Sequence, residues 1–199
     1  MSAVSLRVDD AGYARAARQV ASPNFDARPP GEAITLVVVH GISLPPGVFE
    51  GDAVMRLFTN TLDPAADPSF ATIAGLRVSA HFLVRRDGEL LQFVSCNDRA
   101  WHAGASAWRG RERCNDFSIG VELEGADDTP YDAAQYVRLA SLLRALKRRY
   151  PSIGAAAGHS DIAPGRKTDP GPAFDWDLLS RLTGAPRLPS GLARPSGRQ

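Results

Sequence analysis

The segment spanning residues 158–172 carries a high density of chemically active side chains for its length. It contains His159 and Asp169, with Lys167 between them. Glycines and prolines punctuate the segment, which predicts a loop of defined shape and no regular element. A chain reversal between His159 and Asp169 would bring an imidazole and a carboxylate to one point. Such a point could be one half of a metal or catalytic site.

His40 is a candidate for the other half. It ends the β-branched run of residues 34–40 and is followed at once by Gly41. A continuous apolar run of this kind predicts a strand buried on both faces. Two imidazoles and a carboxylate with an open fourth position form a catalytic zinc arrangement. Taken singly, His40 and His159 are each more often structural. The spacing of the full set is a weak signal by itself, because no local motif such as HExxH links its members.

A metal-activated water needs a base and a cation to stabilise the developing oxyanion. Residues 117–125 alternate strictly, which places Glu122 and Glu124 on a polar face that we expect to look into a cleft. Glu122 is the natural base, and Glu124, nearer the strand end, ranks second. Lys167 is the natural oxyanion partner, with Arg166 as its competitor. The alternative for Lys167 is a solvated loop lysine.

The two other histidines are less informative. His81 lies within the predicted strand 77–84, and we interpret it as a packed, hydrogen-bonded core residue. His102 follows Trp101 in a loop and could either bind a ligand or cap a turn.

The pattern along the chain predicts one α/β (α+β) domain with a mixed central β-sheet flanked by helices. Strands are expected at residues 34–40, 77–84, 89–94, 117–125 and 153–158, and helices at 49–62 and 131–150. Asp87-Gly88 predicts a hairpin turn. Residues 1–33 are expected to wrap the core. The domain is assigned to residues 1–183, and the Pro-, Gly-, Ser- and Arg-rich residues 184–199 are expected to be a disordered tail.

Composition narrows the functional class. The chain has 199 residues, 44% hydrophobic residues and a net charge of +1, so bulk charge gives no case for nucleic acid or an anionic membrane as partner. We find no signal-peptide pattern and no apolar run approaching the roughly 20 residues of a membrane span. Cys96 and Cys114 form no CxxC pair and are interpreted as reduced thiols. We therefore expect a cytoplasmic protein.

The segment 158–172, GHSDIAPGRKTDPGP, resembles the metal-binding loop of the AmpD family, the anhydro-N-acetylmuramyl-L-alanine amidases of peptidoglycan recycling. Further blocks resemble family segments in the same order: SPNFDARP, VVVHGISLPPGVF, FTNTLDP, LRVSAHFLVRRDGELLQFV, RAWHAG and GRERCNDFSIGVELEG. The resemblance covers roughly residues 22–176. It implies a peptidoglycan-recognition-protein-like fold, with a zinc cleft above a mixed sheet.

By this resemblance the zinc ligands fall on His40, His159 and Asp169, and the catalytic pair on Glu122 and Lys167. The implied reaction is hydrolysis of the amide between the lactyl group of 1,6-anhydro-N-acetylmuramic acid and L-alanine of the stem peptide. The implied partner is a small anhydro-muropeptide in the cytoplasm, bound by a protein that we expect to be a monomer.

Substrate contacts implied by the same resemblance include Arg77, Trp101, Arg113 and the loop after His40. One residue departs from the family pattern, which has Asn after the first zinc histidine where this chain has Gly41. An amide side chain there could hydrogen-bond the sugar. We therefore expect intact hydrolysis with weaker discrimination of the sugar.

Two other functions are compatible with parts of the sequence. A non-catalytic muropeptide-binding protein on the same fold is the main alternative, but such relatives often lose a ligand or the catalytic pair, and all five residues are present here. Direct DNA binding is suggested only by the Arg-rich tail, and no recognition-helix motif accompanies it.

Overall fold

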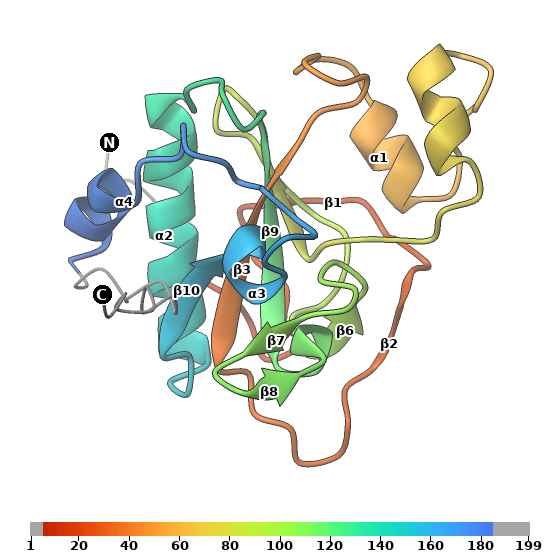
Figure 1. Cartoon of the computed structure of the whole chain (residues 1–199). Coiled ribbons are helices and arrows are strands. Elements are labelled where there is room, and N and C mark those ends of the chain that lie inside the picture. Colours follow the sequence, from red (N-terminus) through yellow and green to blue (C-terminus); the bar gives the residue numbers. More distant parts are fainter. Residues whose placement is uncertain (1–5, 185–199) are drawn as a thin grey trace, which may run out of the picture.

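A six-stranded mixed sheet forms the centre of the protein in the computed structural model, which describes residues 6–184 (Figure 1). In spatial order the strands are β1 (Arg18–Gln19), β5 (Leu90–Gln92), β4 (Phe82–Val84), β9 (Ser118–Glu124), β3 (Leu36–Ile42) and β10 (Ala155–Gly158). The four strands β4, β9, β3 and β10 run parallel, and β5 is antiparallel to β4. Their carboxyl ends therefore meet at one edge, where sites in such sheets form.

The two long central strands are buried on both faces because their residues alternate between two cores. In β3, Val37 and Val39 pack into the cluster under α2, and Leu36 and Val38 pack on the opposite side. In β9 the apolar residues Ile119, Val121 and Leu123 all join the α2 cluster. The polar residues of β9 consequently point away from α2, as the alternation predicted.

Helices cover the sheet unequally. The long helix α2 (Ala133–Arg149) lies along one face and α4 (Trp176–Thr183) packs outside it. On the other side, α1 (Ala53–Phe58) and the 3-10 helix η1 (Pro68–Ile73) stand beside β4 and β5, and α3 (His159–Ile162) follows β10 (Figure 1). The described helices include none with the length and hydrophobicity needed to span a bilayer.

Smaller elements complete the face opposite α2. They are the pair β2 (Phe25–Ala27) and β6 (Asp98–Ala100), the hairpin β7 (Ala107–Trp108) and β8 (Arg111–Glu112), and the 3-10 helix η2 (Cys114–Asp116). The predicted mixed sheet with flanking helices is thus confirmed, as is the turn at Asp87-Gly88 between β4 and β5.

A predicted helix and a predicted strand are shorter in the structure than the sequence indicates. The helix expected over 49–62 is limited to six residues, because Gly51 and Asn60 adopt positive φ at its two ends. The strand expected from residue 77 begins only at Phe82, since the Val78 carbonyl is taken by the Asn24 side chain and the Ser79 N–H by the Trp101 carbonyl. The disordered tail assigned to residues 184–199 lies, beyond Gly184, outside the described residues.

Candidate metal centre and active site

Three predicted ligands meet at the carboxyl edge of the parallel strands. His40 lies near the end of β3, and His159 follows directly after β10, which pairs with β3 so that Gly158 is opposite Val39. The loop after α3 then returns Asp169 to the same point. The two Nδ1 atoms are 3.0 Å apart, and each lies 3.2 Å from Asp169 Oδ2.

This donor set fits a tetrahedral zinc ion. Zinc–ligand bonds of about 2.0–2.1 Å place neighbouring donor atoms about 3.3 Å apart, close to the spacing seen here. His40, His159 and Asp169 form a group that could hold a metal ion, and both histidines are buried. Burial lowers the pKa of His40 to about 4, with repulsion from His159 adding to the effect and Asp169 opposing it. The ring is therefore neutral at physiological pH, which is the metal-binding form.

The returning loop is held by backbone contacts. The Ser160 N–H donates to the Asp169 carbonyl at 2.9 Å, and the buried Tyr131 hydroxyl donates to the Pro170 carbonyl at 2.9 Å. Gly158 leaves room for the Pro170 ring, since a Cβ there would come within 2.9 Å of Pro170 Cδ. These contacts fix the backbone on both sides of the Asp169 carboxylate.

Glu122 is paired in register with His40 and shares its face of the sheet. Its Oε2 atom is the one buried side-chain oxygen or nitrogen among the described residues that has no hydrogen-bond partner. Burial raises the pKa of Glu122 well above its usual range, the Asp169 charge raises it further, and Lys167 opposes both. A buried carboxylate left unsatisfied is costly, so this placement calls for a use in binding or catalysis.

Glu124, which ranked second as a base, is already engaged. Its carboxylate accepts from Arg85 at 3.1 Å and from the Arg86 N–H at 3.1 Å. These partners hold it at the end of β9, away from the role of a free proton acceptor. The two glutamates therefore differ in their partners, and the choice of Glu122 as the base stays a prediction.

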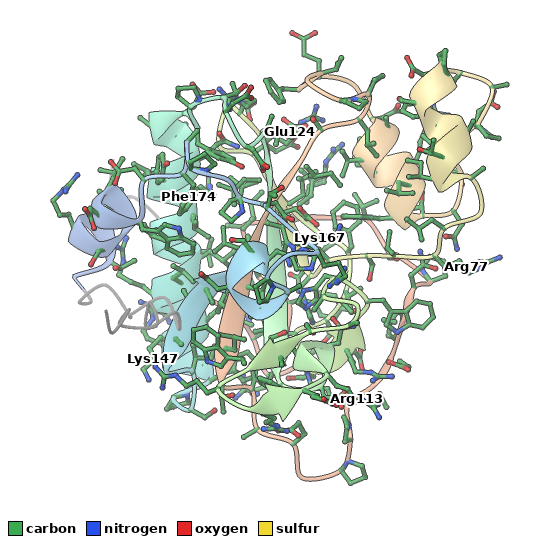
Figure 2. The ribbon with its side chains drawn as sticks, in the orientation of Figure 1. Arg77, Arg113, Glu124, Lys147, Lys167 and Phe174 are labelled. Carbon is green, nitrogen blue, oxygen red and sulfur yellow. The ribbon has the colours of Figure 1, made fainter. Side chains whose placement is uncertain are left out.

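Lys167 and Arg166 also differ in their contacts. The Arg166 guanidinium donates to the carbonyls of Ala103 and Ala105, so it ties the loop to the segment after Trp101. Lys167 is exposed beside α3 over the middle of the sheet (Figure 2). Its charge acts on the pKa values of both Glu122 and His40, so it lies close enough to influence the site.

The two remaining histidines are both buried. His81 packs as predicted, and its ring contacts the Arg28 guanidinium, the Asp98 carbonyl and the Gly120 N–H. His102 is neither a ligand of the three-residue group nor a turn cap. Its Nδ1 lies 3.0 Å from His40 Nε2, behind the metal-facing nitrogen. No local sequence pattern predicts this contact, because it depends on packing between the loop and β9.

The predicted substrate contacts lie outside this cluster. Arg77 is exposed and lines a small pocket between α1 and η1 with Leu57 and Phe70. Arg113 is exposed and pairs with Asp116, and Trp101 is half-buried with its indole N–H donating to Asp26. Figure 2 places Arg77 and Arg113 toward the margins of the view, apart from Lys167. Their role in substrate binding stays a prediction.

Gly41 follows His40, and a side chain at this position would point to the α2 side of the sheet. A Cβ at this position would lie 2.3 Å from the Tyr131 hydroxyl and 3.5 Å from Pro170 Cα. A larger residue would therefore press first on the hydroxyl that supports the metal loop. Its effect on sugar recognition stays a prediction.

Comparison with known proteins places this geometry in context. Residues 30–172 match the family described as N-acetylmuramoyl-L-alanine amidase. The 1,6-anhydro-N-acetylmuramyl-L-alanine amidase AmpD of Escherichia coli K12 is 61% identical over 166 residues, covering 83% of this chain and 91% of the relative. A crystal structure of a Se-Met AmpD derivative superposes with a TM-score of 0.83 at 56% identity, covering 87% of this chain and 97% of the other.

A more distant solved structure carries a ligand. The E. coli amidase AmiD, in complex with the substrate anhydro-N-acetylmuramic acid-L-Ala-D-γ-Glu-L-Lys, has a TM-score of 0.56 and 32% identity. The match covers 89% of this chain and 65% of AmiD.

Proposed function

Since the chain belongs to the N-acetylmuramoyl-L-alanine amidase family, we propose that it is a zinc-dependent amidase acting on anhydro-muropeptides. The bond cleaved is the amide between the lactyl group of 1,6-anhydro-N-acetylmuramic acid and L-alanine of the stem peptide. The names of the AmpD relatives and the substrate bound to AmiD support this assignment. A place in cytoplasmic peptidoglycan recycling is part of the same proposal and rests on the resemblance.

The observation that carries the proposal is the pairing of a three-donor group with an unsatisfied buried carboxylate. His40, His159 and Asp169 converge within 4.8 Å, and Glu122 stands opposite His40 with a free oxygen. A protein that only bound muropeptides would gain nothing from the cost of burying Glu122. The non-catalytic alternative is therefore disfavoured.

His40, His159 and Asp169 would hold the zinc ion, which would act as a Lewis acid that activates water and polarises the amide carbonyl. Glu122 takes the proton of the attacking water on its free carboxylate oxygen and later delivers a proton to the departing nitrogen of L-alanine. A raised pKa suits both roles, because proton transfer is most efficient when the pKa lies near the working pH. We assign to the Lys167 ammonium the role of stabilising the developing oxyanion.

The test compares wild-type protein with Glu122→Ala on a defined anhydro-muramyl tripeptide, with products identified by mass and zinc content measured on both proteins. We expect wild type to release anhydro-N-acetylmuramic acid and the intact tripeptide. Glu122→Ala should bind zinc but release neither product. A wild type that binds zinc and the muropeptide without cleaving it would favour the non-catalytic alternative.

A further inference from the structure

One short segment, His102-Ala103, contacts the outward-facing nitrogen of both histidine ligands. His102 Nδ1 lies 3.0 Å from His40 Nε2, and the Ala103 carbonyl lies 3.2 Å from His159 Nε2. We propose that this segment, anchored by Ser118, fixes the tautomers of both ligands so that their Nδ1 lone pairs face the metal. The inference rests on the proposed zinc site and adds His102 and Ser118 to it as positioning residues.

The direction of each hydrogen bond on the His40 side follows from a backbone carbonyl. The Cys114 carbonyl can only accept, so the Ser118 hydroxyl, 2.6 Å away, donates to it. Ser118 Oγ is then free to accept from His102 Nε2, at 3.3 Å. With its proton on Nε2, a neutral His102 presents an Nδ1 lone pair to His40.

His40 must therefore donate its Nε2–H to His102, which leaves the His40 Nδ1 lone pair facing His159 and Asp169. His102 is buried, and burial favours the neutral form of an imidazole. On the other side, His159 Nε2 lies 3.2 Å from the Ala103 carbonyl, which can only accept, and 3.4 Å from Arg166 Nη2, which can only donate. Arg166 Nη2 already donates to the same carbonyl at 2.7 Å, so we assign the His159 proton to Nε2, which leaves Nδ1 for the metal. Both ligands thus reach the metal position in the same tautomer.

The fold makes room for this arrangement and holds it. A Cβ at Gly120 would come within 2.4 Å of the His102 ring, so a glycine is needed under it on β9. The Asn115 side chain accepts from the N–H groups of His102 and Ala103, at 3.2 and 2.8 Å. The segment is therefore fixed from below by β9 and from the side by the η2 turn.

Loss of the Ser118 hydroxyl would remove the constraint on His102. The ring could then carry its proton on Nδ1 and donate to His40 Nε2, which drives the His40 proton onto the nitrogen that should bind metal. Contacts that orient metal ligands in this way typically contribute 10–100-fold to metal affinity. Ser118 touches no ligand itself, so an effect on zinc would have to pass through His102.

The experiment measures zinc affinity by chelator competition for wild type, Ser118→Ala, Ser118→Thr and Ser118→Val, with unfolding midpoints of the zinc-free proteins as a control. Thr and Val have nearly the same shape and differ in the hydroxyl. We expect zinc affinity to fall about tenfold in Ser118→Ala and Ser118→Val, and Ser118→Thr to bind more tightly than Ser118→Val. Equal affinity of wild type and Ser118→Ala, or of Thr and Val variants that both fold, would overturn the inference.

A spectroscopic readout tests the tautomers directly. The chain has four histidines, so long-range 1H–15N spectra of zinc-free protein labelled at histidine nitrogen can be assigned by substitution. We expect His102 to carry its proton on Nε2 and His40 to carry its proton on the Nε2 that faces His102 in wild type. A proton on His102 Nδ1 would refute the arrangement even if zinc binds. A wild type that binds no zinc while showing these tautomers would count against the proposed function and leave the tautomer assignment standing.

Discussion

At the scale of single residues, the site is distinguished by a buried side-chain oxygen that lacks a hydrogen-bond partner. Most polar groups around it have partners: Glu124 has two arginines, His81 three contacts, and Arg166 two carbonyls. Glu122 differs, because one of its oxygens is buried without a partner. A buried charge without a partner lowers the free energy of unfolding. Glu122 should therefore affect how that free energy depends on pH.

Glu122→Gln should abolish amidase activity and stabilise the zinc-free protein at neutral pH. The unfolded carboxyl has a pKa of about 4.3, whereas burial raises it in the folded state. Between those two values the folded state holds a proton that the unfolded state has released, so wild-type stability falls as pH rises. Glutamine does not ionise, so the variant does not lose stability in this way. Urea unfolding from pH 4 to pH 8 should show the variant's advantage growing with pH, and a constant difference would contradict the raised pKa.

Lys167→Ala should lower kcat by about 100-fold with a smaller effect on KM, because the ammonium acts mainly on charge that develops in the transition state. Lys147 is the one other lysine of the chain and provides the control. Its ammonium donates to the carbonyls of Pro151 and Ile153 beyond the end of α2. Lys147→Ala should lose stability and keep its kcat. If the Lys167 variant kept full kcat, the lysine would be a solvated loop residue.

The expected loss of sugar discrimination at Gly41 can be tested by comparing rates on anhydro-muramyl and ordinary muramyl tripeptides. Gly41 has no side chain and therefore no amide to offer the sugar, so we predict only a weak preference in kcat/KM for the anhydro substrate. A strong preference for the anhydro sugar would show that recognition does not depend on residue 41.

At the scale of elements, the metal loop depends on a helix on the opposite side of the sheet. Tyr131 precedes α2, and its ring occupies space left by two glycines, since a Cβ at Gly41 or Gly125 would meet it within 2.3 Å. The hydroxyl reaches the Pro170 carbonyl, next to Asp169. The segment before α2 thereby supports one ligand, while β3 and β10 supply the other two.

Tyr131→Phe should weaken zinc binding as well as folding. Removing the hydroxyl leaves a buried carbonyl without its donor, at a cost of about 1–3 kcal/mol in unfolding free energy. Tyr136→Phe is the matched control, because its hydroxyl accepts from the Asp175 N–H near the start of α4. Both variants should lose stability in urea, and Tyr131→Phe alone should lose zinc affinity. Equal zinc affinities would mean that the Pro170 contact is purely structural.

At the scale of the whole molecule, much of the framework can be predicted from the sequence because its signals are local. The apolar run of β3, the alternation of β9 and the periodicity of α2 each mark an element within one stretch. The short strands β1, β2 and β6 carry no such signal, because they are defined by partners about 70 residues away.

Within the site, too, some residues have a local sequence signal and others depend on distant neighbours. His40 and His159 could be singled out because each stands where a strand gives way to a Gly- or Pro-rich loop, and Asp169 because it lies at the other end of the loop that follows His159. The part played by His102 could not, since it requires Gly120 beneath its ring, Ser118 at one nitrogen and His40 at the other. Those neighbours come from two strands, β9 and β3, and only the folded sheet brings them together under the loop that carries His102.

The most direct test of the central claim is amidase activity as a function of zinc content. Protein stripped by chelator is titrated with zinc while release of the tripeptide from an anhydro-muramyl tripeptide is followed by mass. The account predicts no release from the stripped protein and full recovery at one zinc per chain, with no recovery in His40→Ala. Cleavage that persists in fully stripped protein, or a His40→Ala variant as active as wild type, would contradict it.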